Sequence, residues 1–192
     1  MARTPSTMLE LGTSAPDFTL PEPTSGSTVS RSDFAGRPLM VVFWCNHCPF
    51  VKHIARRVGE LADAYMPQGI AFVSITSNDV NYKPEDGVDK MPAFIAEYGI
   101  HFPYLYDEDQ AVAKAYRAAC TPDFYLFDAG HKLAYRGQFD DARPGNDAPV
   151  TGADLEAAIK ALLGGHPIAA EQKASLGCNI KWKPDNEPDY FG

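Results

Sequence analysis

Residues 43–49 read Phe43-Trp44-Cys45-Asn46-His47-Cys48-Pro49 and join an apolar run to an amphipathic segment. The run, residues 39–44 (LMVVFW), is unbroken, as is typical of a fully buried strand. After Pro49, where a first-turn proline is tolerated, apolar residues recur at helical spacing: Val51, Ile54, Val58, Leu61 and Tyr65. The two cysteines are therefore predicted to lie at a strand-to-helix junction.

The flanking segments extend this unit into an α/β domain. Residues 70–77 (IAFVSITS) predict a second buried strand, which completes a right-handed βαβ unit. The segments 123–127 and 132–138, joined by a turn, predict a β-hairpin. Helices are expected over 90–98, 109–116 and 151–163, the last with a capping box in which Asp154 follows Thr151 by three positions. Residues 15–20 are expected to start a small N-terminal hairpin.

Length and charge limit the function classes. The chain of 192 residues predicts one domain, 1–192, with a core of about 9–164 and an aromatic C-terminal extension, 165–192, packed against it. The net charge of −8 argues against a general binder of nucleic acid or anionic membranes. No apolar run has the length of a membrane span.

The cysteine content favours redox or metal chemistry over structural disulfides. No apolar core of signal-peptide length follows the first residues, so we expect a cytoplasmic protein, where thiols stay reduced. The four cysteines at 45, 48, 120 and 178 are then better explained as catalytic, redox-active or metal-binding residues. For the isolated Cys120 and Cys178, plain burial in the core is an equal alternative.

The spacing of Cys45 and Cys48 suits thiol–disulfide exchange. A cysteine attacks as a thiolate, and a helix N-terminus lowers the thiol pKa. The predicted junction places Cys45 there, with Cys48 about one turn further, so Cys45 is expected to attack a disulfide and Cys48 to resolve the mixed disulfide. His47 either favours the anionic form of Cys45 or is an untuned loop histidine. Both alternatives stay open.

A CxxC pair can also be half of a zinc site. Structural zinc sites usually bring a second closely spaced pair, whereas Cys120 and Cys178 stand alone in the sequence. One of His47, His53 and His101 would have to complete such a site. We therefore expect no metal and no bound cofactor besides a redox-active Cys45–Cys48 disulfide.

Taken together, these segments resemble the thioredoxin superfamily. The matching pieces are the apolar strand, Trp44-Cys45-x-x-Cys48-Pro49, the helix, the next strand, and Thr121-Pro122 before the strand 123–127. The resemblance implies a thioredoxin fold, with a central mixed sheet flanked by helices, and a cis bond before Pro122 beside the redox pair. The residues 12–20 and 33–38 are similar to the redoxin branch, which includes peroxiredoxins, as is the insertion between 77 and 116. The stretch 177–183 resembles a bacterial peroxiredoxin-like subgroup.

Within that branch, the residues favour disulfide exchange over peroxide reduction. Peroxiredoxins carry Pro-x-x-x-Thr-x-x-Cys, and aligning Cys48 with its cysteine puts Cys45 at the threonine and Val41 at the proline. The peroxide-activating arginine aligns at about Pro122. We expect a thiol–disulfide oxidoreductase acting on a disulfide-containing protein or a small thiol, with an unidentified cellular reductant. The alternatives are a hydroperoxide-reducing peroxidase and a zinc-binding or redox-sensing interaction module.

Several residues around the pair keep open roles. In many thioredoxins a buried acid six positions before the first cysteine helps transfer the proton of the resolving cysteine, and here that position is Leu39. If a proton acceptor is needed it must come from elsewhere, such as Glu97, Asp140 or Asp141. For the two aspartates a solvated loop is the favoured interpretation. Cys120 is expected at the rim of the site as a third redox thiol or as a small buried residue, and Cys178 could resolve the site or pair with Cys120. Trp44 could shield the disulfide and form part of a partner-docking surface, and it could belong to the edge of the core; both can hold at once.

Overall fold

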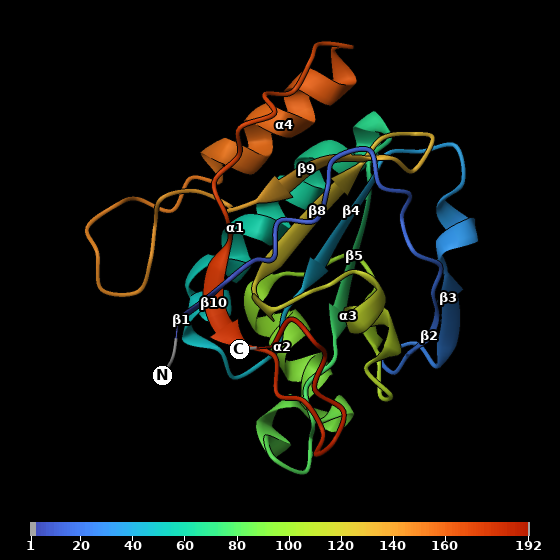
Figure 1. The fold of residues 1–192 in the computed structure, drawn as a ribbon, viewed down its shortest axis with the longest axis vertical. Helices are drawn as coiled ribbons and strands as arrows, with labels where there is room; N and C mark the ends of the chain where they lie inside the picture. The colour runs from blue at the N-terminus through green and yellow to red at the C-terminus, as the bar shows by residue number, and fades with distance from the viewer. Residues whose placement is uncertain (1–2, 192) are drawn as a thin grey trace.

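A five-stranded mixed sheet forms the centre of the computed structural model, which describes residues 3–191 (Figure 1). The strands lie in the order β6-β5-β4-β8-β9. β4, β5 and β6 are parallel, and β8 and β9 continue the sheet antiparallel. Their bounds are β4 Leu39–Phe43, β5 Ala71–Thr76, β6 Tyr104–Tyr106, β8 Asp123–Phe127 and β9 Leu133–Gly137. The βαβ unit and the hairpin are confirmed, and the whole is the expected thioredoxin fold.

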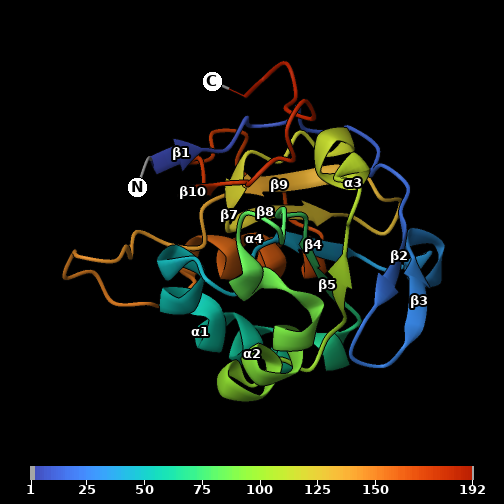
Figure 2. The same cartoon turned by 90° about the horizontal axis from the view of Figure 1, so that it is seen from below.

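Helices cover both faces of this sheet (Figure 2). α1, α2 and α4 pack on one face, and α3 packs on the other with the N-terminal hairpin. Along β4, Met40 and Val42 point to the first face and Val41 and Phe43 to the second, because successive strand residues alternate. No helix within residues 3–191 is long and apolar enough to cross a membrane. The helices are α1 Pro49–Tyr65, α2 Met91–Tyr98, α3 Ala111–Ala115 and α4 Ala153–Leu163, with 3-10 turns at Arg31–Phe34, Met66–Gln68, Pro84–Asp86 and Val88–Lys90.

Two smaller sheets surround the central one. The predicted N-terminal hairpin is formed by β2 (Thr19–Glu22) and β3 (Ser27–Ser30). A second sheet joins the two ends of the chain: β10 (Leu176–Asn179) lies between β1 (Arg3–Pro5) and β7 (Cys120–Thr121). The tail continues over the second face of the central sheet, where Trp182 joins the core. The C-terminal extension is thereby brought beside the segment that precedes Pro122.

The predicted capping box of α4 is wrong. Gly152 is the N-cap, with a positive φ of 74° that glycine adopts without strain. The backbone N–H groups of Thr151 and Gly152 donate to Oδ2 of Asp140 at 2.6 and 2.7 Å. Asp140 is accordingly only 3% exposed, which also corrects the interpretation of this residue as part of a solvated loop. Asp140, which accepts these N–H groups, lies eleven residues before Thr151 and therefore outside the local sequence pattern.

Candidate active site

Cys45 and Cys48 lie at the junction of β4 and α1, as predicted. Cys45 comes two residues after the end of β4, and Pro49 is the first residue of α1. Cys48, not Cys45, is therefore the N-cap of the helix, because the proline fixes the first helical position. This corrects the basis on which Cys45 was expected to carry the stabilised thiolate. Both side chains are fully buried.

Thr121 contacts both thiols from the opposite side. The peptide bond between Thr121 and Pro122 is cis, as the resemblance implied. Sγ of Cys48 lies 3.2 Å from the carbonyl oxygen of Thr121, and Sγ of Cys45 lies 3.5 Å from its hydroxyl. The structure thus brings four predicted residues, Cys45, Cys48, Thr121 and Pro122, into one site.

The tail adds a third sulfur. In the antiparallel pairing of β10 with β7, Cys178 lies opposite Thr121 and Asn179 opposite Cys120. Sγ of Cys178 is 2.8 Å from Sγ of Cys48, so the cysteine that Cys178 contacts is Cys48 rather than Cys120. Cys120 is fully buried, with its Sγ 3.5 Å from the carbonyl oxygen of Pro122, and belongs to the interior rather than to the rim.

The three neighbouring thiols differ in acidity. Hydrogen bonds from Cys178 and then Cys45 lower the pKa of Cys48 well below its ordinary value, with a further contribution from the backbone N–H of Val51. Burial raises the pKa of Cys45, and the hydrogen bond to Cys48 and the charge of Asp86 raise it further. The hydrogen bond to Cys48, followed by burial, raises the pKa of Cys178. The lowered pKa favours Cys48 over the other two thiols as the carrier of a negative charge, and the N-terminus of α1 favours it there as well.

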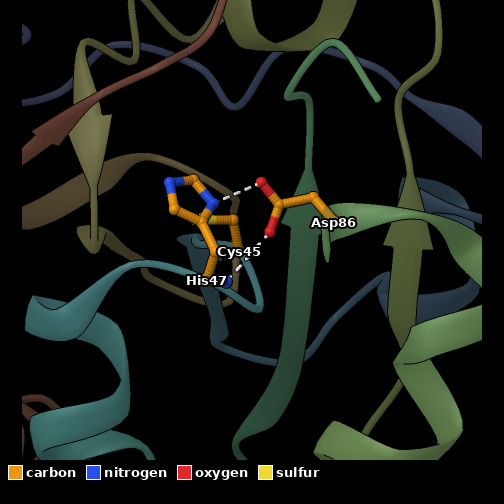
Figure 3. Close-up of side chains that lie close together, drawn as sticks. All are labelled: Cys45, His47 and Asp86. Carbon is orange, nitrogen blue, oxygen red and sulfur yellow. Dashed lines mark hydrogen bonds and ion pairs between the residues drawn. The ribbon is translucent and has the colours of Figure 1, made fainter. Parts of the chain in front are cut away.

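His47 is held by Asp86, a residue that the sequence did not single out (Figure 3). Nδ1 of His47 lies 2.6 Å from Oδ2 of Asp86 and 3.6 Å from Sγ of Cys45. The same carboxylate accepts the backbone N–H groups of Asn46 and His47 at 2.8 and 3.0 Å. Although burial opposes ionisation, hydrogen bonds from His47 and Asn78 hold the pKa of Asp86 below its usual value. Asp86 therefore fixes the loop between the cysteines.

A metal could be held only if this cluster opened. The ligand atoms of Cys45, His47 and Asp86 lie within 4.8 Å of one another. Two ligands of one tetrahedral zinc, each about 2.0–2.2 Å from the metal, stand about 3.3–3.6 Å apart. The 2.6 Å between His47 Nδ1 and Asp86 Oδ2 is shorter and is the length of a charge-assisted hydrogen bond. The described geometry is that of a hydrogen-bonded loop.

Trp44 belongs to the core and offers no docking surface. Its ring is fully buried and packs edge-on against Phe94 and Tyr104, with centroid separations of 5.5 and 5.7 Å. The alternative in which Trp44 docks partners is therefore wrong. Its position between β4 and α2 instead makes it a support for the Cys45 backbone.

Two grooves open on either side of His47. One, of about 430 Å³, is lined by His47 and Cys178 together with Tyr82, Lys83, Lys181 and Trp182, among others. The other, also of about 430 Å³, is lined by His47, Lys52, Glu85 and Phe94, among others. Both have the size of small-molecule sites. The first groove brings a substrate-sized space up to Cys178.

The sequence profile of the AhpC/TSA family matches residues 11–136, about two thirds of the chain. The chain belongs to the AhpC/TSA family. The match spans β2 to β9 and includes Cys45, Cys48 and Pro122. Cys178 and β10 lie outside the part that defines this family.

Individual relatives divide between close structures and distant enzymes. This AhpC/TSA protein is 50% identical to a conserved protein of Geobacillus kaustophilus, covering 96% of this chain and 98% of the other at a TM-score of 0.93. It is 48% identical to a hypothetical protein of Sinorhizobium meliloti 1021, covering 94% and 99% at a TM-score of 0.91. Thiol-disulfide oxidoreductase ResA of Geobacillus thermodenitrificans is 26% identical over 130 residues, 68% of this chain and 70% of that protein.

Proposed function

We propose that this protein is a thiol–disulfide oxidoreductase in which Cys45 and Cys48 cycle between dithiol and disulfide. The observation that carries the proposal is the pair of thiols at the start of α1, both in contact with Thr121 beside the cis proline. The similarity to ResA, a thiol–disulfide oxidoreductase by name, supports the same chemistry.

Cys48 itself can serve as the proton acceptor for Cys45, because its pKa is the lower of the two. Because Cys48 holds the charge, it accepts the proton of Cys45, and the Cys45 thiolate attacks one sulfur of a substrate disulfide. The first substrate thiolate leaves and takes the proton from Cys48. Cys48 then attacks Sγ of Cys45, which releases the second substrate thiolate and leaves the Cys45–Cys48 disulfide. No acid at Leu39 is needed for these steps.

The substrate is a disulfide-containing protein or a small disulfide that enters from a groove beside His47. Two protein thiols are oxidised for each substrate disulfide reduced, so a cellular reductant must return the pair to the dithiol. The cytoplasmic location belongs to the same proposal, and cell fractionation with a tagged chain would test it.

Serine variants test the exchange directly. Reduction of a protein disulfide such as that of insulin, with dithiothreitol as electron donor, is expected from the natural chain, absent from Cys48→Ser and strongly slowed in Cys45→Ser. Cys120→Ser, which changes a buried thiol outside the site, is the matched control and should keep its rate. Full activity of Cys45→Ser would overturn the proposal.

A peroxidase is the second candidate, favoured by the low pKa of Cys48 at a helix N-terminus within the AhpC/TSA family. The Cys48 thiolate would attack a peroxide oxygen, giving a sulfenic acid and water, and Cys45 would condense with it to form the disulfide and a second water. Stoichiometric hydrogen peroxide would then remove two thiols per chain within seconds. A rate no faster than that of free cysteine counts against this candidate.

A further inference from the structure

The contact between Cys48 and Cys178 is close to a bond. Their Sγ atoms are 2.8 Å apart, and a further approach of about 0.8 Å would reach the disulfide length of about 2.05 Å. The two residues are separated by 130 positions in the sequence. Their sulfurs meet because the tail strand pairs with the segment that also contacts the redox pair.

The backbone holds Cys178 in place. Cys178 lies between Gly177 and Asn179 in the middle of β10, which is paired on both sides, with Arg3 and Thr121 opposite Cys178. A Cβ atom at Gly177 would lie 2.0 Å from the carbonyl oxygen of Thr121, so the strand packs directly on that segment. The position of Sγ is therefore set by paired strands and not by a loop.

Cys178 is also the cysteine nearest the exterior. It lines the groove of about 430 Å³ beside His47 and is 2% exposed, whereas Cys45 and Cys48 are fully buried. Cys178 is thus in contact both with the buried pair and with a space large enough for a small thiol or disulfide.

We propose that Cys178 is a third redox-active thiol of this site, forming a disulfide with Cys48 in exchange for the Cys45–Cys48 disulfide. The inference rests on the proposed thiol–disulfide oxidoreductase function and extends it from two sulfurs to three. The exchange moves the disulfide from the fully buried pair to a cysteine that lines the groove.

The exchange balances without any further reactant. The Cys178 thiolate attacks Sγ of Cys48, the Cys48–Cys178 bond forms and the Cys45–Cys48 bond breaks. The electron pair goes to Sγ of Cys45, which takes up the proton that Cys178 gave up. One disulfide replaces another, so the chain is neither oxidised nor reduced.

The charge distribution makes this exchange depend on the redox state. In the reduced site the hydrogen bond between Cys178 and Cys48 raises the pKa of Cys178, so Cys178 keeps its proton. When Cys48 is part of a disulfide its negative charge is gone, and this reason for Cys178 to stay protonated disappears. The nucleophile is thus released in the oxidised state, when its target bond exists.

Disulfide mapping tests the proposal with oxidised glutathione as the oxidant. After oxidation, acid quench, alkylation of remaining thiols and tryptic digestion, peptide 174–181 contains Cys178, and peptide 32–52 contains both Cys45 and Cys48. A linked pair of these peptides is expected from the natural chain. The link should persist in Cys45→Ser, disappear in Cys48→Ser and be unchanged in Cys120→Ser.

A kinetic arm separates a redox role from a structural one. In Cys45→Ser, glutathione bound to Cys48 is expected to be released by Cys178, whereas in Cys45→Ser/Cys178→Ser it should stay bound. The difference in release rate should be about tenfold or more, since a positioned group has a large effective molarity. Cys178→Ala, which like the serine variant lacks the thiol, should behave as Cys178→Ser does if both remain folded by circular dichroism.

The outcomes separate the two proposals. If peptide 32–52 forms its internal disulfide and reduces insulin normally, while no link to peptide 174–181 appears in the natural chain or in Cys45→Ser, the role of Cys178 is overturned and the proposed function stands. If neither disulfide forms and insulin is not reduced, the proposed function itself has failed.

Discussion

Oδ2 of Asp86 lies 2.6 Å from Nδ1 of His47, although the two residues are 39 positions apart. Asp86 is at the end of the 3-10 turn Pro84–Asp86, in the insertion between β5 and α2. The insertion therefore supports the site: its carboxylate orients the histidine and caps two N–H groups of the loop between the cysteines. His47 thus has a fixed ring orientation beside Cys45.

Asp86→Asn tests this support. The variant keeps an acceptor oxygen but loses the charge, so it should lower the free energy of unfolding by about 1–3 kcal/mol, the cost of losing a charged hydrogen bond. It should also lower the pKa of Cys45, because the Asp86 charge raises it. Urea unfolding measures the first effect and pH-dependent alkylation of Cys45, read by peptide mass, the second. Asp89→Asn, at an exposed position, is the control and should leave the urea midpoint unchanged.

Thiolate absorbance near 240 nm should identify Cys48 as the charged sulfur. Because its pKa is lowered, the reduced chain should retain one thiolate at about pH 6, well below the ordinary cysteine pKa of about 8.5. The signal should vanish in Cys48→Ser and persist in Cys120→Ser. Cys178→Ser should shift the titration to higher pH, since the strongest donor to Cys48 is weakened. A full signal in Cys48→Ser would contradict the assignment.

Asp123 should make the protein less stable as pH rises. Burial raises its pKa to about 7, against hydrogen bonds from Ala119 and Tyr125 that favour the charge. The folded state thus holds a proton that the unfolded chain releases near pH 4, so this residue's contribution to stability falls between about pH 4 and 7 by up to about 1.4 kcal/mol per unit. Thermal unfolding of Asp123→Asn across this range should show a flatter pH dependence than the natural chain. An unchanged slope would contradict the shift.

Gly177→Ala should displace the tail strand. The new Cβ would overlap the carbonyl oxygen of Thr121, and relief requires movement of backbone on one side. We expect a loss of about 1–3 kcal/mol, as for overpacked sites, and faster alkylation of Cys178. Gly130→Ala, whose nearest neighbouring atom would be an Asp128 carboxylate oxygen at 3.3 Å, should leave the Cys178 alkylation rate unchanged. Equal alkylation rates in the two variants would contradict the tight packing at Gly177.

Local patterns predicted the frame of the site, and long-range contacts decided its chemistry. Three local patterns predicted the strand, the helix and the cis proline. They are the apolar run before Cys45, the helical periodicity after Pro49 and the Thr121-Pro122 pair. The contacts of Asp140 with the segment before α4 and of Asp86 with the cysteine loop gave no such local pattern, because either carboxylate reaches the N–H groups only through the tertiary fold. Aspartates in turn-rich segments look alike in sequence whether solvated or buried.

The cysteines show the same division. Placing them at a strand-to-helix junction was correct, but which of the two caps the helix depended on a single position, fixed by Pro49. The contact between Cys48 and Cys178 depended on the register of two short strands, which composition does not reveal. From the sequence, a role for Cys178 required that the tail fold back over the site. The pairing of β10 with β7 shows that it does, and that Cys178 meets Cys48 there.

The close packing of Gly177 against Thr121 also fixes the register of β10 relative to β7. A shift of β10 by one residue would bring Leu176 or Cys178 to a place where a side chain has no room, and would turn every side chain of the strand to its other face. A strand of four residues, too short to fix its alignment by hydrophobic pattern alone, thereby has one allowed setting. A missing side chain at position 177 keeps the sulfur at 178 in line with its partner.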